Sequence, residues 1–509
     1  MGVVGGGTAG WFAALAIKRA FPSLEVTVIA SREIPIIGVG EATTPLLVPF
    51  LAVDLGIDAG ALLEAVRPTW KLGIQFQWAA RDFHYAFGDA DLIGALAHEG
   101  DLRACSLTSR LMTADASPIL RDGEGYASLL GELKFAWHLD NARLVPFLAA
   151  EGARAGVKQI DLVINSVDIN DHGVTALVCG ERRLSYDLYV DCSGFRSLLL
   201  DALGVPFHSY ADSLWCDRAW VGEVGNGGHF RPYTVATTMD AGWCWSIAAS
   251  DVTPHEDHRG YVYSSRFVDD ETAADEMRRK NPGVGALRPV RFRSGRRAEM
   301  WRGNVVAVGN SYGFVEPLES TALHMAVLAS FVARRAAAFL DGNDDLRERE
   351  RVRLNARMGA HWDYLRWFLA LHYRFNTRSQ SPFWQAARAE VNVNGLDEVI
   401  ERFRARGPLG LAGEPERDDD PVFGVRGLDV MLLGQGVPSP LPAPRIAVDE
   451  WQARALAQRQ LVERALPQRS ALALLGRDPS SLRTLLASED GWPRLLRRAF
   501  LERMGLPST

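Results

Sequence analysis

The sequence predicts an α/β protein that begins with a Rossmann-type βαβ unit and continues into a mostly helical second half. A glycine-rich turn stands between a short apolar strand and an alanine-rich helix near the N-terminus. Two later apolar runs also end in turns that contain glycine, as strands of a parallel sheet do beside a ligand. Helical periodicity prevails from about residue 327 onward. With 509 residues, the chain can hold two or three domains.

The N-terminal segment carries the pattern of the βαβ unit. Residues 3–4 predict a truncated strand, residues 5–10 a turn and residues 11–21 a helix. The β-branched run at 25–29 predicts the second strand.

Four further segments extend this α/β pattern. Residues 144–156 predict a helix, and residues 160–184 predict a meander of alternating strands. The short strands expected at 188–190 and 305–308 are the two apolar runs that end in glycine-containing turns. We expect them in one parallel sheet with the N-terminal strands.

Polar breaks divide the helical half. They fall at 407–420 and 438–444, and the tail from 448 to 506 is rich in Ala, Leu and Arg. The tail predicts two to four amphipathic helices.

Composition and charge narrow the function. The chain has 56 basic and 62 acidic residues, so its net charge of -6 provides no basic field for nucleic acid. Five scattered cysteines without CxxC spacing favour reduced thiols over disulfides or a metal site. The N-terminus lacks a secretory pattern, and His324 and two arginines interrupt the apolar stretch 322–340. We expect a cytoplasmic protein with neither a nucleic-acid nor a membrane partner.

The first glycine-rich turn matches GxGxxG at Gly5, Gly7 and Gly10. In that motif the glycines permit a tight turn, a close backbone approach to a pyrophosphate and close helix packing. A plain βα turn is the alternative. The acidic residue expected after the second strand is missing, and Ser31 or Glu41 are candidates for the ribose contact. The two later strand ends favour FAD over NAD, because the longer flavin needs contacts from separate segments.

A second motif points elsewhere. Residues 309–313 match GxSxG after a strand, the pattern of an α/β-hydrolase nucleophile elbow. Ser311 would be the nucleophile, with His324, His361 or His372 as its base. We disfavour this interpretation, because a hydrolase does not need the N-terminal phosphate cradle, whereas a Gly-Asn turn suits a flavin.

Eight segments, in order, resemble the flavin-dependent tryptophan halogenases across roughly residues 1–440. The segments are GGGTAGW at 5–11, GVGEATTP at 38–45, TWKLGI at 69–74, DCSGFR at 191–196, GWCWSI at 242–247, FVEPLEST at 314–321, PFW at 382–384 and LGQG at 433–436. The tryptophan motif, Trp243-Cys244-Trp245-Ser246-Ile247, and the PLEST sequence at 317–321 are together specific to this family.

The resemblance implies an FAD-binding module like that of flavin monooxygenases, topped by a mostly helical substrate module. It divides the chain into the FAD module with inserted β-rich segments (1–345), the substrate module (346–445) and a helical extension (446–509). It also implies that a separate flavin reductase supplies FADH2. Reaction with O2 then gives a flavin hydroperoxide, which oxidises chloride or bromide to hypohalous acid.

The resemblance assigns roles to individual residues. The implied cofactor-binding residues are Gly5, Gly7, Thr8, Ala9, Gly10, Ser31, Gly40, Glu41, Ala42, Thr43, Asp191, Gly309, Asn310 and Gly313. The implied chloride site is the backbone N–H groups of Thr321 and Ala322. Since the family has glycine where Ala322 stands, this turn must avoid a positive φ there.

The implied catalytic pair is Lys71 and Glu319. Lys71 would hold the chlorinating species by hydrogen bonds or as a chloramine, and Glu319 would polarise it and take the ring proton. The alternatives are a solvated lysine and a helix-capping glutamate. Trp243 and Trp245 would screen the flavin from the substrate, or are simply core residues. Implied substrate-side or tunnel residues also include Phe87 and Ser320.

The substrate region departs from the family. Tyr85 and Ala86 stand where the family has His and Pro, although Phe87 keeps the stacking ring. Residues 427–432 contain no tyrosine pair to hold an amino-acid head group. We therefore expect an indole-like compound or a tryptophan within a peptide rather than tightly held free tryptophan. The tail after 448 is either a peptide-docking surface or a cap on the core.

Two rivals remain at this level, an aromatic hydroxylase and a non-catalytic flavoprotein or peptide-binding module. The hydroxylase does not require Lys71, the tryptophan motif or PLEST, and its product would form without halide. A homodimer is a further expectation.

Overall fold

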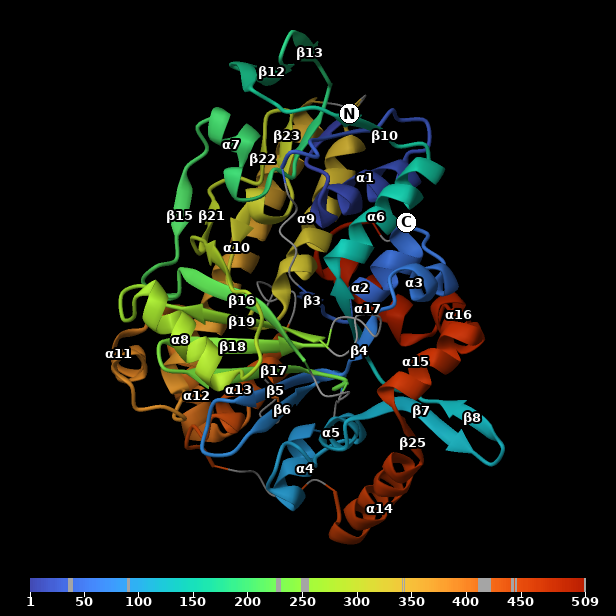
Figure 1. Cartoon of the computed structure of the whole chain (residues 1–509), viewed down its shortest axis with the longest axis vertical. Coiled ribbons are helices and arrows are strands. Elements are labelled where there is room, and N and C mark those ends of the chain that lie inside the picture. Colours follow the sequence, from blue (N-terminus) through green and yellow to red (C-terminus); the bar gives the residue numbers. More distant parts are fainter. Residues whose placement is uncertain are drawn as a thin grey trace.

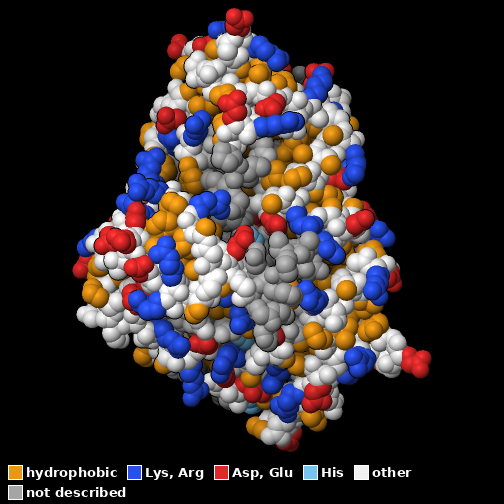
Figure 2. Space-filling view, in the orientation of Figure 1, with side chains coloured by type: hydrophobic (Ala, Val, Ile, Leu, Met, Phe, Trp, Pro, Cys, Tyr) orange, Lys and Arg blue, Asp and Glu red, His pale blue; other side chains and the backbone are white. Residues whose placement is uncertain are grey.

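The computed structural model describes residues 1–34, 40–88, 92–225, 230–248, 256–340, 342, 344–410, 423–440, 444 and 446–507. The resemblance places the GVGEATTP segment (38–45) as a strap over the flavin, and residues 38 and 39 of this flavin strap lie outside the described part. Residues 411–420 and 441–443 of the two polar breaks also lie outside it. Figure 1 shows a parallel-sheet region near the N-terminus, a second sheet across the middle and C-terminal helices along one side. Basic and acidic side chains are interspersed over the face in Figure 2, in keeping with the small net charge.

The first sheet has six strands in the order β10-β2-β1-β14-β23-β22. Its strands are β10 (Lys158–Asp161), β2 (Thr27–Ala30), β1 (Gly2–Val4), β14 (Tyr189–Asp191), β23 (Val305–Ala307) and β22 (Trp301–Arg302). All neighbours pair in parallel except β22 with β23. The two later strands therefore lie in one parallel sheet with β1, as predicted, and their carboxyl ends share an edge with the first turn.

The expected meander is only partly correct. Its first strand, β10, joins the parallel sheet beside β2. The antiparallel remainder is β11 (Ser166–Asn170), β12 (Gly173–Cys179) and β13 (Arg182–Leu184). The alternation of apolar and polar residues and the turn residues between strands do not reveal which sheet a short strand joins.

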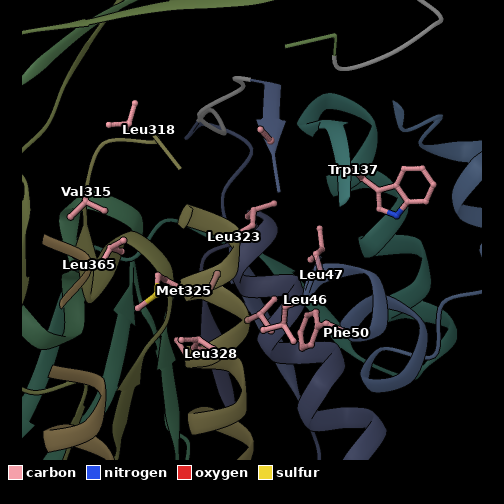
Figure 3. Close-up of a cluster of buried hydrophobic side chains, with 14 of the residues drawn as sticks. Leu46, Leu47, Phe50, Trp137, Val315, Leu318, Leu323, Met325, Leu328 and Leu365 are labelled. Carbon is pink, nitrogen blue, oxygen red and sulfur yellow. The ribbon is translucent and has the colours of Figure 1, made fainter. Parts of the chain in front are cut away.

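Helix α1 (Thr8–Ala20) packs between the first sheet and helices α6 (Asn141–Arg154) and α9 (Thr321–Ala337). It is almost entirely buried up to Ile17, so its apolar surface is not restricted to one stripe. Figure 3 shows α9 beside the segment around α2 (Leu47–Pro49) and the π-helix Phe50–Asp54, with Leu323 on the side of Leu47 and Met325 on the opposite side, near Leu365. The labelled side chains there include Leu46, Leu47, Phe50, Leu323, Met325 and Leu328.

The second sheet has seven strands in the order β20-β16-β19-β18-β17-β5-β6. These are β20 (Arg288–Arg291), β16 (Arg218–Gly225), β19 (Glu256–Tyr263), β18 (Gly242–Ile247), β17 (Thr234–Met239), β5 (Gly73–Gln77) and β6 (Phe83–Ala86). All of its pairs are antiparallel except β17 with β5. Because side chains alternate along a strand, Trp243 and Trp245 of β18 share one face.

A small antiparallel sheet, β3-β9-β4, lies between the two larger sheets in Figure 1. Its strands are β3 (Gly40–Ala42), β9 (Ala136–Asp140) and β4 (Thr69–Lys71). This sheet carries Glu41 on one outer strand and Lys71 on the other, and so links the flavin strap to the lysine segment.

The helical half contains α10 (Asp344–Phe375), α11 (Pro382–Glu390), α12 (Asp397–Arg406) and α13 (Gly424–Gly434). The tail forms four helices, as predicted: α14 (Val448–Arg464), α15 (Gln468–Arg477), α16 (Ser480–Ala487) and α17 (Trp492–Arg503). It also contains a strand that the sequence analysis missed, β25 (Ala465–Pro467), which pairs with β7 (Ala116–Asp122). Helix α17 packs against α2 (Figure 1).

The remaining elements connect these layers. They are α3 (Ala59–Ala65), α4 (Leu92–Glu99), α5 (Leu107–Thr113), β8 (Gly125–Ser128), α7 (Leu198–Ala202), β15 (Phe207–Ser209), α8 (Asp270–Lys280), β21 (Gly295–Arg297), β24 (Gly313–Phe314) and the 3-10 turns Gly194–Arg196, Gly309–Ser311 and Asn394–Leu396. Among the described residues, no helix combines the length and apolarity needed to cross a bilayer.

Candidate active site

The glycines of the first turn differ in what surrounds them. Gly5 has φ +115°, and a Cβ there would lie 2.3 Å from the carbonyl oxygen of Cys192. A Cβ on Gly10 would lie 2.0 Å from the carbonyl oxygen of Gly5. Gly7, by contrast, faces open space at the N-terminus of α1, which has no side-chain cap. The turn thus fits a pyrophosphate lying against Gly7 and the first N–H groups of the helix.

A chain of hydrogen bonds ties this turn to the strap. The hydroxyl of Thr8 donates to Oδ1 of Asn141 (3.2 Å), and Nδ2 of Asn141 donates to Oε1 of Glu41 (2.9 Å). Burial raises the pKa of Glu41 to about 7, against the opposing effect of the Asn141 hydrogen bond. The sequence did not indicate that Asn141 belongs to the site, because only the tertiary fold brings the start of α6 to the turn.

The other two strand-end turns lie beside the first. Gly309 has φ +72°, and a Cβ there would lie 2.9 Å from Cβ of Ala9. The carboxylate of Asp191 instead accepts hydrogen bonds from within its own turn and the start of α7, from Ser193, Leu199 and Leu200. Asp191 therefore shapes the turn through these bonds, and its contact with a cofactor stays a prediction.

The contacts of three other predicted cofactor residues are as follows. Oγ of Ser31 accepts from the N–H of Glu33 (3.1 Å), and the hydroxyl of Thr43 donates to the carbonyl of Trp137 (2.8 Å). Asn310 lines a small cavity together with Gly309 and Gly313. Their roles toward a cofactor stay predictions.

The hydrolase interpretation is wrong. The hydroxyl of Ser311 is buried and lies 3.0 Å from the carbonyl oxygen of Val308, with the carbonyl of Asp191 also in contact. Two of its candidate bases have other partners: His324 contacts the hydroxyl of Thr44 (2.7 Å), and His372 contacts Glu319. Ser311 therefore ties two strand ends together.

Lys71 is completely buried at the end of β4. Its Nζ donates to the carbonyl oxygen of Thr43 (2.9 Å) and to Oγ of Ser320 (2.7 Å), and it lies 5.1 Å from the centre of the Phe87 ring. Burial lowers the pKa of Lys71 to about 7, although the nearby charge of Glu319 raises it. The amine is therefore no solvated surface charge, and both of its protonation states are accessible near neutral pH.

Glu319 is buried next to Lys71, but its direct partner is a histidine. Oε1 of Glu319 lies 2.8 Å from Nε2 of His372, which is on α10 and completely buried. Nδ1 of His372 lies 2.8 Å from the carbonyl oxygen of Phe368. The side chain of Glu319 does not cap α9. His372 had entered the sequence analysis only as a candidate hydrolase base.

The start of α9 has an unusual backbone. Ser320, its N-cap, lies in the left-handed region at φ 58° and makes no side-chain cap hydrogen bond. Thr321 and Ala322 are the first helical residues, and Oγ1 of Thr321 is buried without a partner. The positive φ thus falls on Ser320, which leaves Ala322 in helical geometry as expected. Both residues line the small cavity that Gly309, Asn310 and Gly313 also line.

The tryptophans of β18 are buried, with ring centres 6.0 Å apart. Nε1 of Trp243 donates to Oε2 of Glu316 (2.9 Å), which also accepts from the hydroxyl of Tyr373. Burial raises the pKa of this carboxyl to about 7, against the opposing effect of the hydrogen bonds from Tyr373 and Trp243. The Glu316 contact orients the Trp243 ring, and no pattern in the sequence pointed to it. The screening role of Trp243 and Trp245 stays a prediction.

A cavity of about 270 Å3 lies beside the Lys71–Glu319 pair. Residues that line it include Tyr85, Phe87, Lys134, Glu319, His324, Phe423, Arg426, Leu496, Phe500 and Arg503. Aromatic side chains dominate the apolar part, and three cationic side chains from separate segments complete the wall. Helix α17 of the tail supplies Leu496, Phe500 and Arg503, so the tail forms part of this cavity.

The open face of Gly7, with two more glycine turns along the same sheet edge, defines an FAD-binding α/β flavoprotein. The family model of the tryptophan halogenases matches residues 1–448 of the chain. The chain belongs to that family and is a flavin-dependent halogenase that uses FADH2, O2 and a halide. This confirms the predicted family, fold class and cofactors, and it argues against a hydroxylase or a non-catalytic flavoprotein.

Individual relatives agree. The tryptophan 7-halogenase RebH of Lentzea aerocolonigenes is 30% identical, with 87% of this chain and 91% of RebH aligned. The structure of MibH, a lanthipeptide tryptophan 5-halogenase, superposes with a TM-score of 0.90 at 44% identity and covers 98% of each chain. The tryptophan 6-halogenase SttH of Streptomyces toxytricini superposes with a TM-score of 0.81 at 30% identity, over 93% of this chain and 99% of SttH.

Proposed function

We propose that this halogenase modifies the indole ring of a tryptophan held within a peptide, with Lys71 presenting the halogen and Glu319 removing the ring proton. One observation carries the proposal: the buried carboxylate of Glu319 lines an aromatic cavity, and the fully buried amine of Lys71 lies close to it, donating to the neighbouring Ser320. Halogenation of an aromatic ring needs both an amine and a carboxylate, because an electrophilic halogen must be directed to one carbon and the proton on that carbon must leave.

The first turn, the strap and the Gly309 turn would hold the flavin. Gly7 and the N-terminus of α1 would face its pyrophosphate, and Glu41, fixed by Asn141, would lie over it. When bound in its reduced form with O2, FAD supplies the oxidant that converts the halide into hypohalous acid. A separate flavin reductase would supply the FADH2.

Halide would bind at the start of α9. The N–H groups of Thr321 and Ala322 lie at the uncapped end of a 17-residue helix, where the partial positive charge favours an anion. These residues line one small cavity with Gly309 and Gly313, which supports a halide site next to the proposed flavin site.

Lys71 would act on the hypohalous acid. As an ammonium it donates hydrogen bonds to the acid; as an amine it forms an N–halogen bond and releases water. A pKa near 7 makes both forms available at neutral pH. In the first case the O–halogen bond breaks as the ring carbon binds the halogen, and the oxygen keeps the electron pair, takes a proton from Lys71 and leaves as water. In the second case the N–halogen bond breaks, and the nitrogen of Lys71 keeps the pair and is reprotonated. In both cases the ring proton passes to Glu319. His372 would keep Glu319 oriented.

A peptide substrate is supported by the tail and by the cavity of about 270 Å3 that Glu319 lines, which we take as the substrate cavity. The family's His-Pro pair is replaced by Tyr85 and Ala86, and α17 forms part of the wall. The match to MibH covers 98% of this chain and so includes most of the tail. An indole-like small molecule is the remaining candidate.

The test compares variants in a complete reaction containing FAD, NADH, a flavin reductase, O2 and chloride. Tryptophan-containing peptides, free tryptophan and free indole are each offered, and products are identified from the chlorine isotope pattern in mass spectrometry. Lys71→Ala should abolish chlorination with FAD still bound, and Lys158→Ala, at an exposed lysine of β10, should retain it. Chlorination by Lys71→Ala would refute the role of Lys71. Chlorination of free indole alone would refute the peptide assignment.

A further inference from the structure

A second cavity, of about 660 Å3, lies outside the active site. The ends of α1 and α9, the π-helix after α2, helix α17 and the residues after it form its wall. Six arginines line it: Arg19, Arg334, Arg335, Arg494, Arg497 and Arg498. The lining carboxylates are Asp54 and Glu489. This concentration of guanidinium groups contrasts with the chain's net charge of -6.

Two of the arginines share one buried carboxylate. Arg497 binds Asp54 in bidentate fashion, with Nε 2.8 Å from Oδ2 and Nη2 2.7 Å from Oδ1. Arg334 donates to the same Oδ1 at 3.0 Å. The side chain of Asp54 is completely buried, whereas the two arginines remain slightly exposed. Burial lowers the pKa of Arg334, with repulsion from Arg497 adding to the effect. Among the described contacts, two guanidinium groups therefore share one carboxylate at this point.

The other four arginines repeat this imbalance. Arg494 pairs with Glu489 at 2.9 Å, and Arg498 reaches the same carboxylate at 4.0 Å. Arg335 pairs with Glu350, and Arg19 donates to the carbonyl of Leu55. Among the described residues, the carboxylate partners of the six guanidinium groups are Asp54, Glu489 and Glu350, and Glu350 is shared with Arg353, so the cationic side chains outnumber the anionic ones there.

We propose that this cavity binds an organic anion of small-molecule size that carries at least two negative charges on phosphate or carboxylate groups. Its volume falls within the roughly 300–1,000 Å3 typical of small-molecule sites. Guanidinium groups bind both anion types through paired hydrogen bonds. Apolar side chains between the arginines, such as Phe21, Val53 and Phe331, provide contacts for a carbon skeleton. The inference does not depend on the proposed substrate.

Helix α17 separates this cavity from the substrate cavity. Arg494, Arg497 and Arg498 line the arginine cavity, and Leu496, Phe500 and Arg503 line the substrate cavity. Because residues three or four apart share a helix face, two faces of one helix serve the two cavities. The arginine cavity is therefore distinct from the substrate cavity, although it is adjacent to it.

Isothermal titration calorimetry on the FAD-saturated enzyme tests the proposal, with inorganic pyrophosphate and citrate as probes at constant ionic strength. Saturation with FAD keeps pyrophosphate out of the flavin site. We expect saturable one-to-one binding of at least one probe; pyrophosphate alone would assign phosphate groups and citrate alone carboxylates. The double variant Arg494→Gln/Arg498→Gln should weaken binding about tenfold or more, because each loses charge-assisted hydrogen bonds. Both side chains are partly exposed, so the fold should be kept.

The matched control is Arg459→Gln/Arg477→Gln, which removes two exposed arginines from α14 and α15 of the same tail. This control should bind the probe as the unmodified enzyme does. The proposal is refuted if neither probe binds saturably. Binding of an acidic peptide in place of both probes would refute it as well, because the proposed ligand is of small-molecule size. It is also refuted if the Arg494/Arg498 variant binds normally, or if the control loses as much affinity.

Discussion

Nε2 of His372 lies 2.8 Å from Oε1 of Glu319, and Nδ1 of the same ring lies 2.8 Å from the carbonyl oxygen of Phe368. Since a carbonyl can only accept a hydrogen bond, Nδ1 must carry a proton. A second proton then lies between Nε2 and Glu319, as an imidazolium with a carboxylate or a neutral ring with a carboxylic acid. The carboxyl group proposed to take the ring proton is therefore held by a partner that can exchange a proton with it.

Replacement of His372 tests this arrangement. His372→Phe should lower kcat on the order of 10- to 100-fold, because Glu319 loses its orienting partner and its route for the proton. His372→Gln, whose amide can still donate to Glu319, should recover part of the rate. The profile of kcat against pH should change shape in both variants, which a purely structural defect would not cause. Unchanged kcat and pH profile in His372→Phe would exclude this role.

Ser320 offers a test of backbone strain at the start of α9. Its φ of 58° is uncommon for a residue with a Cβ, and such positions cost roughly 1–3 kcal/mol. Ser320→Ala and Ser320→Gly both remove the hydroxyl that accepts from Lys71. Only glycine also relieves the strain, so Ser320→Gly should be more stable than Ser320→Ala by about 1 kcal/mol in urea unfolding. Equal stabilities would mean that the backbone there is unstrained.

Local sequence patterns predicted the parts of the site that depend on short segments. The turn with Gly5 and Gly7 and the strand ends at Asp191 and Gly309 follow from glycine spacing after apolar runs. Lys71 and Glu319 came from the family resemblance, and the fold buries both beside one cavity.

Other parts depend on contacts between distant segments, which such patterns do not encode. His372 lies 53 residues from Glu319, and Asn141 lies 100 residues from Glu41. A buried histidine on a helix is usually a core residue, so the sequence offered His372 only as a candidate hydrolase base and not as the partner of Glu319. The same applies to α17, whose amphipathic pattern shows that it packs, without showing that Phe500 lines the substrate cavity.

The depressed pKa of Lys71 predicts how stability depends on pH. The ordinary pKa is 10.5 and the folded value is about 7. Between these values the unfolded chain holds a proton that the folded protein has lost, so the contribution of Lys71 to stability rises with pH. Lys71→Met should therefore stabilise the protein more at pH 6 than at pH 9, by on the order of 2 kcal/mol in urea unfolding. An equal gain at both pH values would contradict the shift.

Glu316 should show the opposite dependence. Its pKa rises from 4.5 to about 7, so between these values the folded protein keeps a proton that the unfolded chain has lost. The contribution of Glu316 to stability therefore falls as pH rises through this window. Glu316→Gln still provides an oxygen for the N–H of Trp243. The stability of this variant, measured relative to the unmodified protein, should therefore be greater at pH 8 than at pH 5. Parallel stability curves for the two proteins would rule out the raised pKa.

Phe500 tests whether the tail takes part in substrate binding or only covers the core. Its ring lies against His324 and Phe331, with centres 6.1 Å away in each case, and it lines the substrate cavity. Phe500→Ala should raise KM for a peptide substrate about tenfold, because an aromatic contact worth about 1 kcal/mol and apolar burial are lost together. FAD affinity, measured by flavin fluorescence, should stay the same, since the flavin turns lie on other elements. Leu495→Ala on the same helix is the control, because Leu495 is 45% exposed and should leave KM unchanged. Equal KM values for the two variants would mean that α17 only covers the core.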